Sequence, residues 1–206
     1  MTGLGQKFER HRPLIGKLLF EIVIIFVGVT AAFALESARQ ERADAAYRQS
    51  MIAALIPTLD DLIRHNRQFE STVDTQIATF DAELARGRRP LLPVYREPGA
   101  EQPPIRAWDG IVATGVSKAL PPALYFDLSL FYTRQESFGE RYIRYAQMTE
   151  QNVLPLGLGQ PGMYDPEGAL KPVFAAYVDR LRDLSAAAKR LDLQARELKA
   201  KVQALS

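Results

Sequence analysis

The sequence predicts an all-α fold, in which one N-terminal transmembrane helix continues into a long kinked helix, packed in an antiparallel helical bundle with a C-terminal heptad helix. Two observations support this prediction. Residues 18–35 form an apolar segment with a single charged residue. Beyond it, apolar residues recur at spacings of three and four, which is the pattern of one helix face. We therefore expect an N-terminal tail at 1–13, a transmembrane helix at 14–35 and a helical bundle domain at 36–206.

The composition excludes several kinds of chemistry. Lys and Arg number 26 against 24 Asp and Glu, whereas a nucleic-acid partner requires a concentrated basic surface. The arginines alternate with acids along the predicted helices, which is typical of a solvated surface. There is no Cys, so disulfides and Cys-based sites are excluded. His11 and His65 are the only histidines, and we expect no metal site, no cofactor and no catalytic triad.

The apolar segment 18–35 has nearly the length of a transmembrane helix. About 20 apolar residues cross a hydrocarbon core of roughly 30 Å, and the segment reaches this length when residues 14–17 are added. The alternative is a cleaved signal peptide, because the sequence Ala-Phe-Ala at 32–34 resembles a cleavage site. Glu21 inside the segment, and the helix-forming residues that follow it, favour a retained anchor.

The distribution of basic residues favours one orientation. Lys and Arg are enriched on the cytoplasmic side of a membrane span. Four of them precede the segment and three follow it: Lys7, Arg10, Arg12, Lys17, Arg39, Arg42 and Arg48. We therefore expect a single-pass protein of a bacterial inner membrane, with its N-terminus in the cytoplasm and its C-terminal domain in the periplasm.

Three residues of the span are candidates for helix–helix interaction in the membrane. Glu21 is an ionisable residue in a transmembrane segment, where such residues often have a function; alternatively, it lies shallow and pairs with Lys17, four residues earlier. Gly28 and Ala32 form a pair of small residues that lets a second helix approach closely. We expect the span to contact a protein partner or a second copy, besides the lipid bilayer.

The bundle domain begins with a long predicted helix at 36–86. Pro57 removes a backbone hydrogen bond, so we expect a kink there, and Gly87 is expected to end the helix. The apolar face of this helix consists of Tyr47, Met51, Leu55, Leu59, Leu62, Phe69, Val73, Ile77, Phe80 and Leu84.

Prolines divide the rest of the chain. A Pro-rich connector is expected at 87–107, with three apolar residues packed across the bundle, namely Leu91, Leu92 and Tyr95. A short helix is expected at 108–118, and a longer one begins at the Pro-Pro sequence of 121–122, because proline suits the first turn of a helix. A Gly- and Pro-rich loop follows at 155–171 and has no phosphate-binding motif.

The C-terminal helix, expected at 172–205, has the most regular pattern in the chain. Its apolar residues alternate spacings of three and four, as in a heptad seam. They are Phe174, Tyr177, Leu181, Leu184, Ala188, Leu191, Ala195, Leu198, Val202 and Leu205. Such a seam must pack against another helix, either the 36–86 helix of the same chain or a second copy. The alanines within the seam favour the intramolecular bundle.

Two segments form a recognisable pattern, namely FEIVIIFVGVTAAFAL in the span and WDGIVATGVSKALPPALYFDLSLFYTR from Trp108 onward. Together they resemble segments of an uncharacterised bacterial family of single-pass inner-membrane proteins. Family members have an N-terminal span, which often carries a glutamate and a central glycine, followed by a helical domain of unknown function. The matching residues are Glu21, Gly28, Trp108, Asp109, Ile111, Gly115, Leu120, Leu124, Leu128, Phe131 and Tyr132. The Pro-Pro sequence at 121–122 departs from the polar pair that is usual there. The resemblance implies the topology and the helical fold, and it implies no activity.

Trp108 and Asp109 open the short helix and admit two interpretations. They could contact a partner or ligand. Alternatively, Asp109 caps the helix and Trp108 closes the end of the bundle, which is the interpretation we favour. Gly115 is expected to mark close helix packing, because glycine costs a helix about 1 kcal/mol relative to alanine.

Two classes of function remain open. The first is a non-enzymatic, membrane-anchored interaction or accessory subunit of a larger complex or a homo-oligomer. The second is an extracytoplasmic ligand-sensing bundle, which would need a pocket and a means of signalling inward. The predicted cytoplasmic portion of about seventeen residues is short for a signalling domain, which favours the first class. The sequence shows no catalytic signature, so we do not expect an enzyme.

Overall fold

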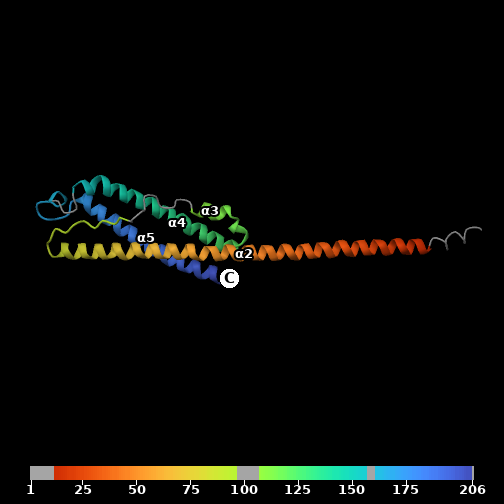
Figure 1. The fold of residues 1–206 in the computed structure, drawn as a ribbon. Coiled ribbons are helices and arrows are strands. Elements are labelled where there is room, and N and C mark those ends of the chain that lie inside the picture. Colours follow the sequence, from red (N-terminus) through yellow and green to blue (C-terminus); the bar gives the residue numbers. More distant parts are fainter. Residues whose placement is uncertain (1–11, 97–106, 157–160, 206) are drawn as a thin grey trace, which may run out of the picture. The chain divides into compact units, whose positions relative to one another are not determined.

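The computed structural model describes residues 12–96, 107–156 and 161–205. In these ranges the regular secondary structure consists of helices and short helical turns, apart from one isolated β-bridge (Figure 1). The all-α prediction is therefore confirmed. The chain divides into two compact units, with the boundary after Tyr47. One contains the apolar segment, and the other, 48–206, contains the helical bundle.

Helix α2, Arg12–Ala85, is the first described helix. It includes Pro57 without a break in the helix. Proline leaves the carbonyl four residues earlier without its usual donor, and both Pro57 and Ala53 are exposed, so water can satisfy that carbonyl. The helix is therefore continuous through Pro57, and the kink expected there stays a prediction.

The predicted apolar face of α2 forms one wall of the bundle core. Six of its residues are buried: Leu55, Leu59, Phe69, Val73, Ile77 and Phe80. Tyr47 was predicted on this face, but it is 45% exposed and lies in the other unit. Asn66 occupies the gap between Leu62 and Phe69; it is buried, and its amide nitrogen donates to the Gln135 side chain at 3.3 Å. A pattern of apolar residues alone does not reveal such a buried polar contact.

The chain leaves α2 through a turn at Gly87, whose φ of +72° is the left-handed conformation that favours glycine. This confirms the predicted end of the helix. In the following connector, Leu92 and Tyr95 are buried as predicted, whereas Leu91 is 62% exposed. The prediction that Leu91 packs across the bundle was therefore wrong. The connector residues 97–106 lie outside the described ranges.

The predicted short helix at 108–118 is two elements. Helix α3, Ala107–Ala113, is followed by a 3₁₀ turn, η1, Val116–Lys118. Gly115 separates them with φ +82°, in the left-handed region. The prediction that Gly115 lies within a helix was wrong, because the residue reverses the backbone between the two elements.

We expect Gly115→Ala to lower the free energy of unfolding by about 1 kcal/mol, because a Cβ disfavours the left-handed conformation. Gly110→Ala is the matched control. Gly110 lies in α3, and a Cβ there would meet no atom within 4 Å, so alanine should be neutral or stabilising by up to about 1 kcal/mol. Urea unfolding followed by the fluorescence of the single tryptophan measures both; equal effects would contradict the prediction.

Helix α4, Pro122–Met148, begins at the predicted Pro-Pro sequence. It continues into a π-helical turn, η2, Thr149–Val153, and two short 3₁₀ turns, η3, Leu154–Leu156, and η4, Pro161–Met163. The rest of the predicted loop closes on itself through an isolated antiparallel bridge between Tyr164 and Leu170. The Tyr164 hydroxyl donates to the Pro90 carbonyl at 2.6 Å, which ties this loop to the connector.

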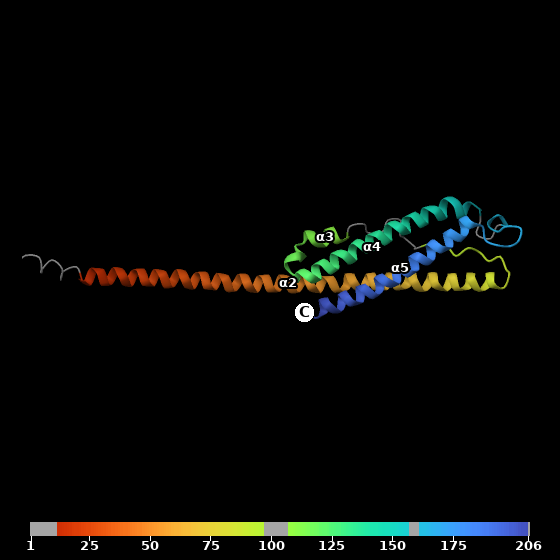
Figure 2. The ribbon, with the colours of Figure 1, turned by 180° about the vertical axis from the view of Figure 1, so that it is seen from behind.

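Helix α5, Pro172–Gln203, packs along α4 and along the bundle part of α2 (Figures 1 and 2). All predicted seam residues are buried except Leu205, which follows the end of the helix and is 41% exposed. The intramolecular alternative for this seam is therefore confirmed. A homo-oligomer stays a prediction.

Ion pairs show that α5 runs antiparallel to both neighbours. Against α2, Lys199 pairs with Asp60 at 2.6 Å, Lys189 with Glu70 at 3.4 Å, and Arg182 with Asp81 at 2.5 Å. In these pairs the residue numbers decrease along α5 as they increase along α2, so the two helices run in opposite directions. Against α4, Lys201 pairs with Asp127 at 2.6 Å, and the Arg180 guanidinium contacts the Met148 sulfur at 3.0 Å at the other end.

Candidate interaction surfaces

The first candidate surface is the apolar segment of α2. Every side chain from Phe20 to Ser37 is exposed, including Phe26 at 70% and Phe33 at 72%. Among the described residues, α2 is the one helix whose length and apolar composition would allow it to cross a membrane. A signal sequence can have a similar length and composition.

The predicted membrane-contact residues all lie on this exposed helix. Glu21 and Ala32 are exposed, and a Cβ built on Gly28 would meet no atom within 4 Å. Space for a second helix is therefore present at Gly28. The side chain of Lys17 lies outside the described residues, so its pairing with Glu21 stays a prediction.

Trp108 is part of the bundle core. It is 9% exposed and stacks on Tyr132, with ring centroids 4.8 Å apart and an interplanar angle of 17°. Asp109 is exposed and is the third residue of α3, three positions beyond the residue that would cap the helix, so the prediction that Asp109 caps this helix was wrong. At this position the negative charge of Asp109 interacts favourably with the positive end of the helix dipole. The two residues therefore point to different surroundings, and they do not form one site.

The hydroxyl of Tyr132 is buried and has no hydrogen-bond partner within the described part of the chain. Burial raises the pKa of Tyr132 from 10.0 to about 12, since the charged phenolate is poorly solvated there. The folded state thus holds this proton more tightly than the unfolded state.

We expect this tyrosine to make the bundle less stable at alkaline pH. The contribution of Tyr132 to the free energy of unfolding is fully present below pH 10. It is lost as the pH rises towards about 12, because unfolding then releases the phenolic proton. Two pH units correspond to about 2–3 kcal/mol. Urea unfolding at several pH values should show a shallower alkaline loss for Tyr132→Phe than for the wild type, and an unchanged slope would contradict the prediction.

A second aromatic cluster lies at the opposite end of α4. The hydroxyls of Tyr145 and Tyr177 are 2.6 Å apart, and their rings stack at 5.0 Å. Thr149, in the π-helical turn, donates to the Tyr177 hydroxyl at 3.2 Å, and the backbone N–H of Tyr95 donates to Tyr145 at 3.3 Å. Burial, together with the neighbouring Tyr177, raises the pKa of Tyr145. The cluster thus links the connector, α4 and α5 to one another.

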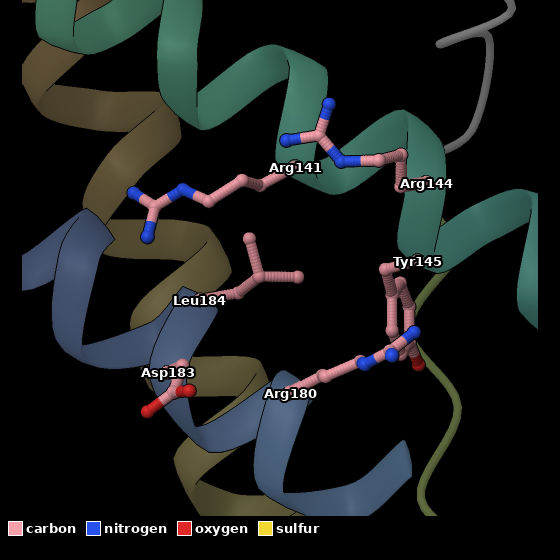
Figure 3. A pocket seen from close by; sticks show the side chains of 6 residues that line it. All are labelled: Arg141, Arg144, Tyr145, Arg180, Asp183 and Leu184. Carbon is pink, nitrogen blue, oxygen red and sulfur yellow. The ribbon is translucent and has the colours of Figure 1, made fainter. Parts of the chain in front are cut away.

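Beside this cluster, the surface between α4 and α5 is hollowed. The main hollow has a volume of about 350 Å³ and is lined by Arg141, Arg144, Tyr145, Arg180, Asp183 and Leu184 (Figure 3). A second hollow of about 300 Å³ shares Arg141 and is lined also by Arg134, Ala187, Arg190, Leu191 and Gln194. We call the two together the arginine groove. Its arginines are exposed, whereas Leu184 and Leu191 at its base are buried.

The charges of the arginine groove are poorly compensated. Among the described residues, Arg134, Arg141, Arg180 and Arg190 form no ion pair with a carboxylate. Arg144 lies 3.9 Å from Glu140, at the limit of an ion pair, and both side chains are more than 60% exposed. Asp183 is the acid that lines the groove. Five guanidinium groups and one exposed carboxylate therefore line a groove whose base is apolar.

The sequence-based prediction missed this groove. Along each helix the arginines alternate with acids, and we interpreted that pattern as a solvated surface. A signal is present in the spacing, because Arg134, Arg141 and Arg144 are separated by seven and three residues and so share one face of a helix. The opposing arginines of α5 become neighbours only through the antiparallel packing.

Comparison of the chain with protein-family models, with curated protein sequences and with solved structures returns no match. The resemblance of the span and of the segment from Trp108 to a bacterial single-pass family stays a prediction.

Proposed function

We propose that this protein is a non-enzymatic, membrane-anchored helical subunit that serves a larger membrane complex or a homo-oligomer. The observation that carries this proposal is the contrast between the two units. The bundle buries most of its large apolar residues, whereas ten large apolar side chains between Phe20 and Leu35 are exposed. Each contributes about 1.5–3 kcal/mol when removed from water, so this helix requires lipid or protein around it.

The polar and small residues of the span support a partner within the membrane. Glu21 is costly in a lipid-exposed position, and ionisable residues in spans usually face protein or water. Gly28 and Ala32 are four residues apart and lie on one face, where the absence of a side chain allows close helix contact. We further propose a bacterial inner membrane, with the N-terminus in the cytoplasm and the bundle in the periplasm, because four basic residues precede the span and three follow it.

A second candidate function is ligand sensing. The main hollow of the arginine groove, at about 350 Å³, falls in the range of small-molecule sites, which is about 300–1,000 Å³. A sensing bundle predicts that a small molecule raises the melting temperature. The exposed arginines favour a larger partner, because they leave the hollow open to solvent.

Purification of a tagged full-length chain from native membranes in mild detergent tests the proposal, with intact-mass analysis of the chain and its companions. A stoichiometric partner or a discrete oligomer, with residues 1–34 retained, would support it. A lone monomer in every mild detergent, or a chain that begins near Leu35, would contradict it.

A matched pair of span variants makes this experiment specific. Gly28→Leu places a large side chain where a partner helix would approach, whereas Val29→Leu changes little on a face turned by about 100°. Loss of the complex in the first variant alone would assign the contact to the Gly28 face.

A further inference from the structure

The basic side chains of α5 differ in how their charges are balanced on the two sides of the helix. On the side of α2, Lys199, Lys189 and Arg182 are paired with acids of that helix. On the side of α4, Arg180 contacts the Met148 sulfur and Arg190 lines the arginine groove, and neither pairs with a carboxylate within the described residues. The fold thus balances the α2 side of α5 with acids of that helix. On the α4 side, Lys201 near the end of α5 pairs with Asp127, whereas Arg180 and Arg190 have no such partner within the described residues.

The dimensions of the arginine groove suit an extended or helical segment. Arg134 and Arg144 are ten residues apart on α4, as are Arg180 and Arg190 on α5, so each row extends over about 15 Å. Between the rows, the base contains the apolar side chains Leu184 and Leu191. A single small anion would contact one end of such a surface, whereas a segment with several carboxylates and some apolar side chains matches its length and its base.

The shape and position of the groove favour a protein segment over a lipid surface. A flat membrane would contact the exposed arginines but could not reach the recessed Leu184. The groove also lies away from the start of this unit. The Asn66–Gln135 contact and the Arg182–Asp81 ion pair place it alongside the stretch of α2 between residues 66 and 81, about 27–50 Å along the helix from Arg48.

We propose that the arginine groove binds an acidic segment of a protein partner, whose Asp or Glu side chains pair with Arg141, Arg180 and Arg190 and whose apolar side chains cover Leu184. Arginine suits this role, because its planar guanidinium group can donate two parallel hydrogen bonds to one carboxylate. The inference rests on the proposed function, and it names the chemistry of the partner.

Binding of a synthetic peptide to the full-length protein in nonionic detergent tests this inference. The probe is a fluorescent peptide that alternates Glu and Leu, and a peptide with Gln in place of Glu is its control. The groove variant is the double substitution Arg141→Gln with Arg190→Gln. Its matched control is Arg64→Gln with Arg88→Gln, two exposed arginines that pair with Asp61 and Glu83 outside the groove. Both variants remove the same charge.

The groove variant is expected to weaken binding of the Glu-Leu peptide by about tenfold at an ionic strength of about 0.15 M, and the control variant by less than about twofold. Unchanged tryptophan fluorescence would show that both variants are folded. Equal weakening in the two variants, equal binding of the Gln peptide, or displacement of the peptide by inorganic triphosphate or by phosphatidylglycerol vesicles as readily as by unlabelled peptide would overturn the inference.

Co-purification from native membranes separates this inference from the proposed function. A partner that the wild type retains and the groove variant loses would support both. A partner that both retain would overturn the role of the groove and leave the subunit proposal standing. A wild-type chain without any partner would contradict the proposed function, whatever the peptide experiment shows.

Discussion

Replacing Ile24 and Val27 by arginine is expected to release the protein from the membrane fraction. Both side chains are exposed, at 54% and 58%, near the middle of the apolar segment. An arginine at the centre of a span costs about 2.5–3.5 kcal/mol, and the lost isoleucine or valine adds a few tenths, so the double variant is disfavoured by about 6–8 kcal/mol. The measurement is the fraction of protein that stays in the membrane pellet after alkaline carbonate extraction.

The control for this experiment is the double substitution Ala45→Arg with Ala46→Arg. Both alanines are exposed in the helix beyond the apolar segment, so the charge increases equally without entering the hydrocarbon region. This variant should remain in the pellet. Release of both variants, or of neither, would contradict the assignment of the membrane contact to residues 18–35.

Leu128→Ala is expected to produce the largest loss of stability in the bundle among single leucine substitutions on α4. Leu128 is 0% exposed and belongs to the main core cluster. Leucine-to-alanine changes at such positions cost about 2–5 kcal/mol, because the cavity that remains is only partly filled by relaxation. Urea unfolding of the full-length chain in detergent micelles measures the change. Trp108 is the single tryptophan and lies in the bundle core, so its fluorescence reports on the bundle and not on the span.

Leu130→Ala provides a matched comparison two residues further along the same helix. Leu130 is 52% exposed, so the same substitution should change the unfolding free energy by less than about 0.5 kcal/mol. Similar losses for both variants would contradict the burial of Leu128 in the core of the bundle. A large loss for Leu130 alone would indicate that its exposed face is covered by another molecule.

The arrangement of apolar residues made most of the helical faces predictable. Along α5, Phe174, Leu181 and Val202 were assigned to the core by spacing alone, and all are buried. Spacing identifies a face because 3.6 residues complete a turn, so it depends only on local geometry. Prediction failed where a residue lies beyond the packed region. Tyr47 and Leu205 fit the pattern, yet both are substantially exposed, because a pattern does not state where the neighbouring helix begins.

The backbone at Gly115 and the buried contact of Asn66 were not predictable for a related reason. A glycine within an apolar and helix-compatible segment is consistent with close packing or with a positive φ, and the choice depends on the path of the chain around it. Asn66 is buried because Gln135 of α4 lies opposite its side chain. Both features depend on residues distant in the sequence.

The sequence by itself determined that this is an all-helical protein with an apolar N-terminal helix, since length, composition and helical periodicity are local properties. It also determined which faces of the helices are apolar. Only the tertiary structure decided which charges are neutralised. The acids of α2 pair with Lys199, Lys189 and Arg182, whereas Arg180 and Arg190 line the same hollows as the arginines of α4. Charge balance depends on distances between helices, and these are set by packing and not by the order of residues along any one helix.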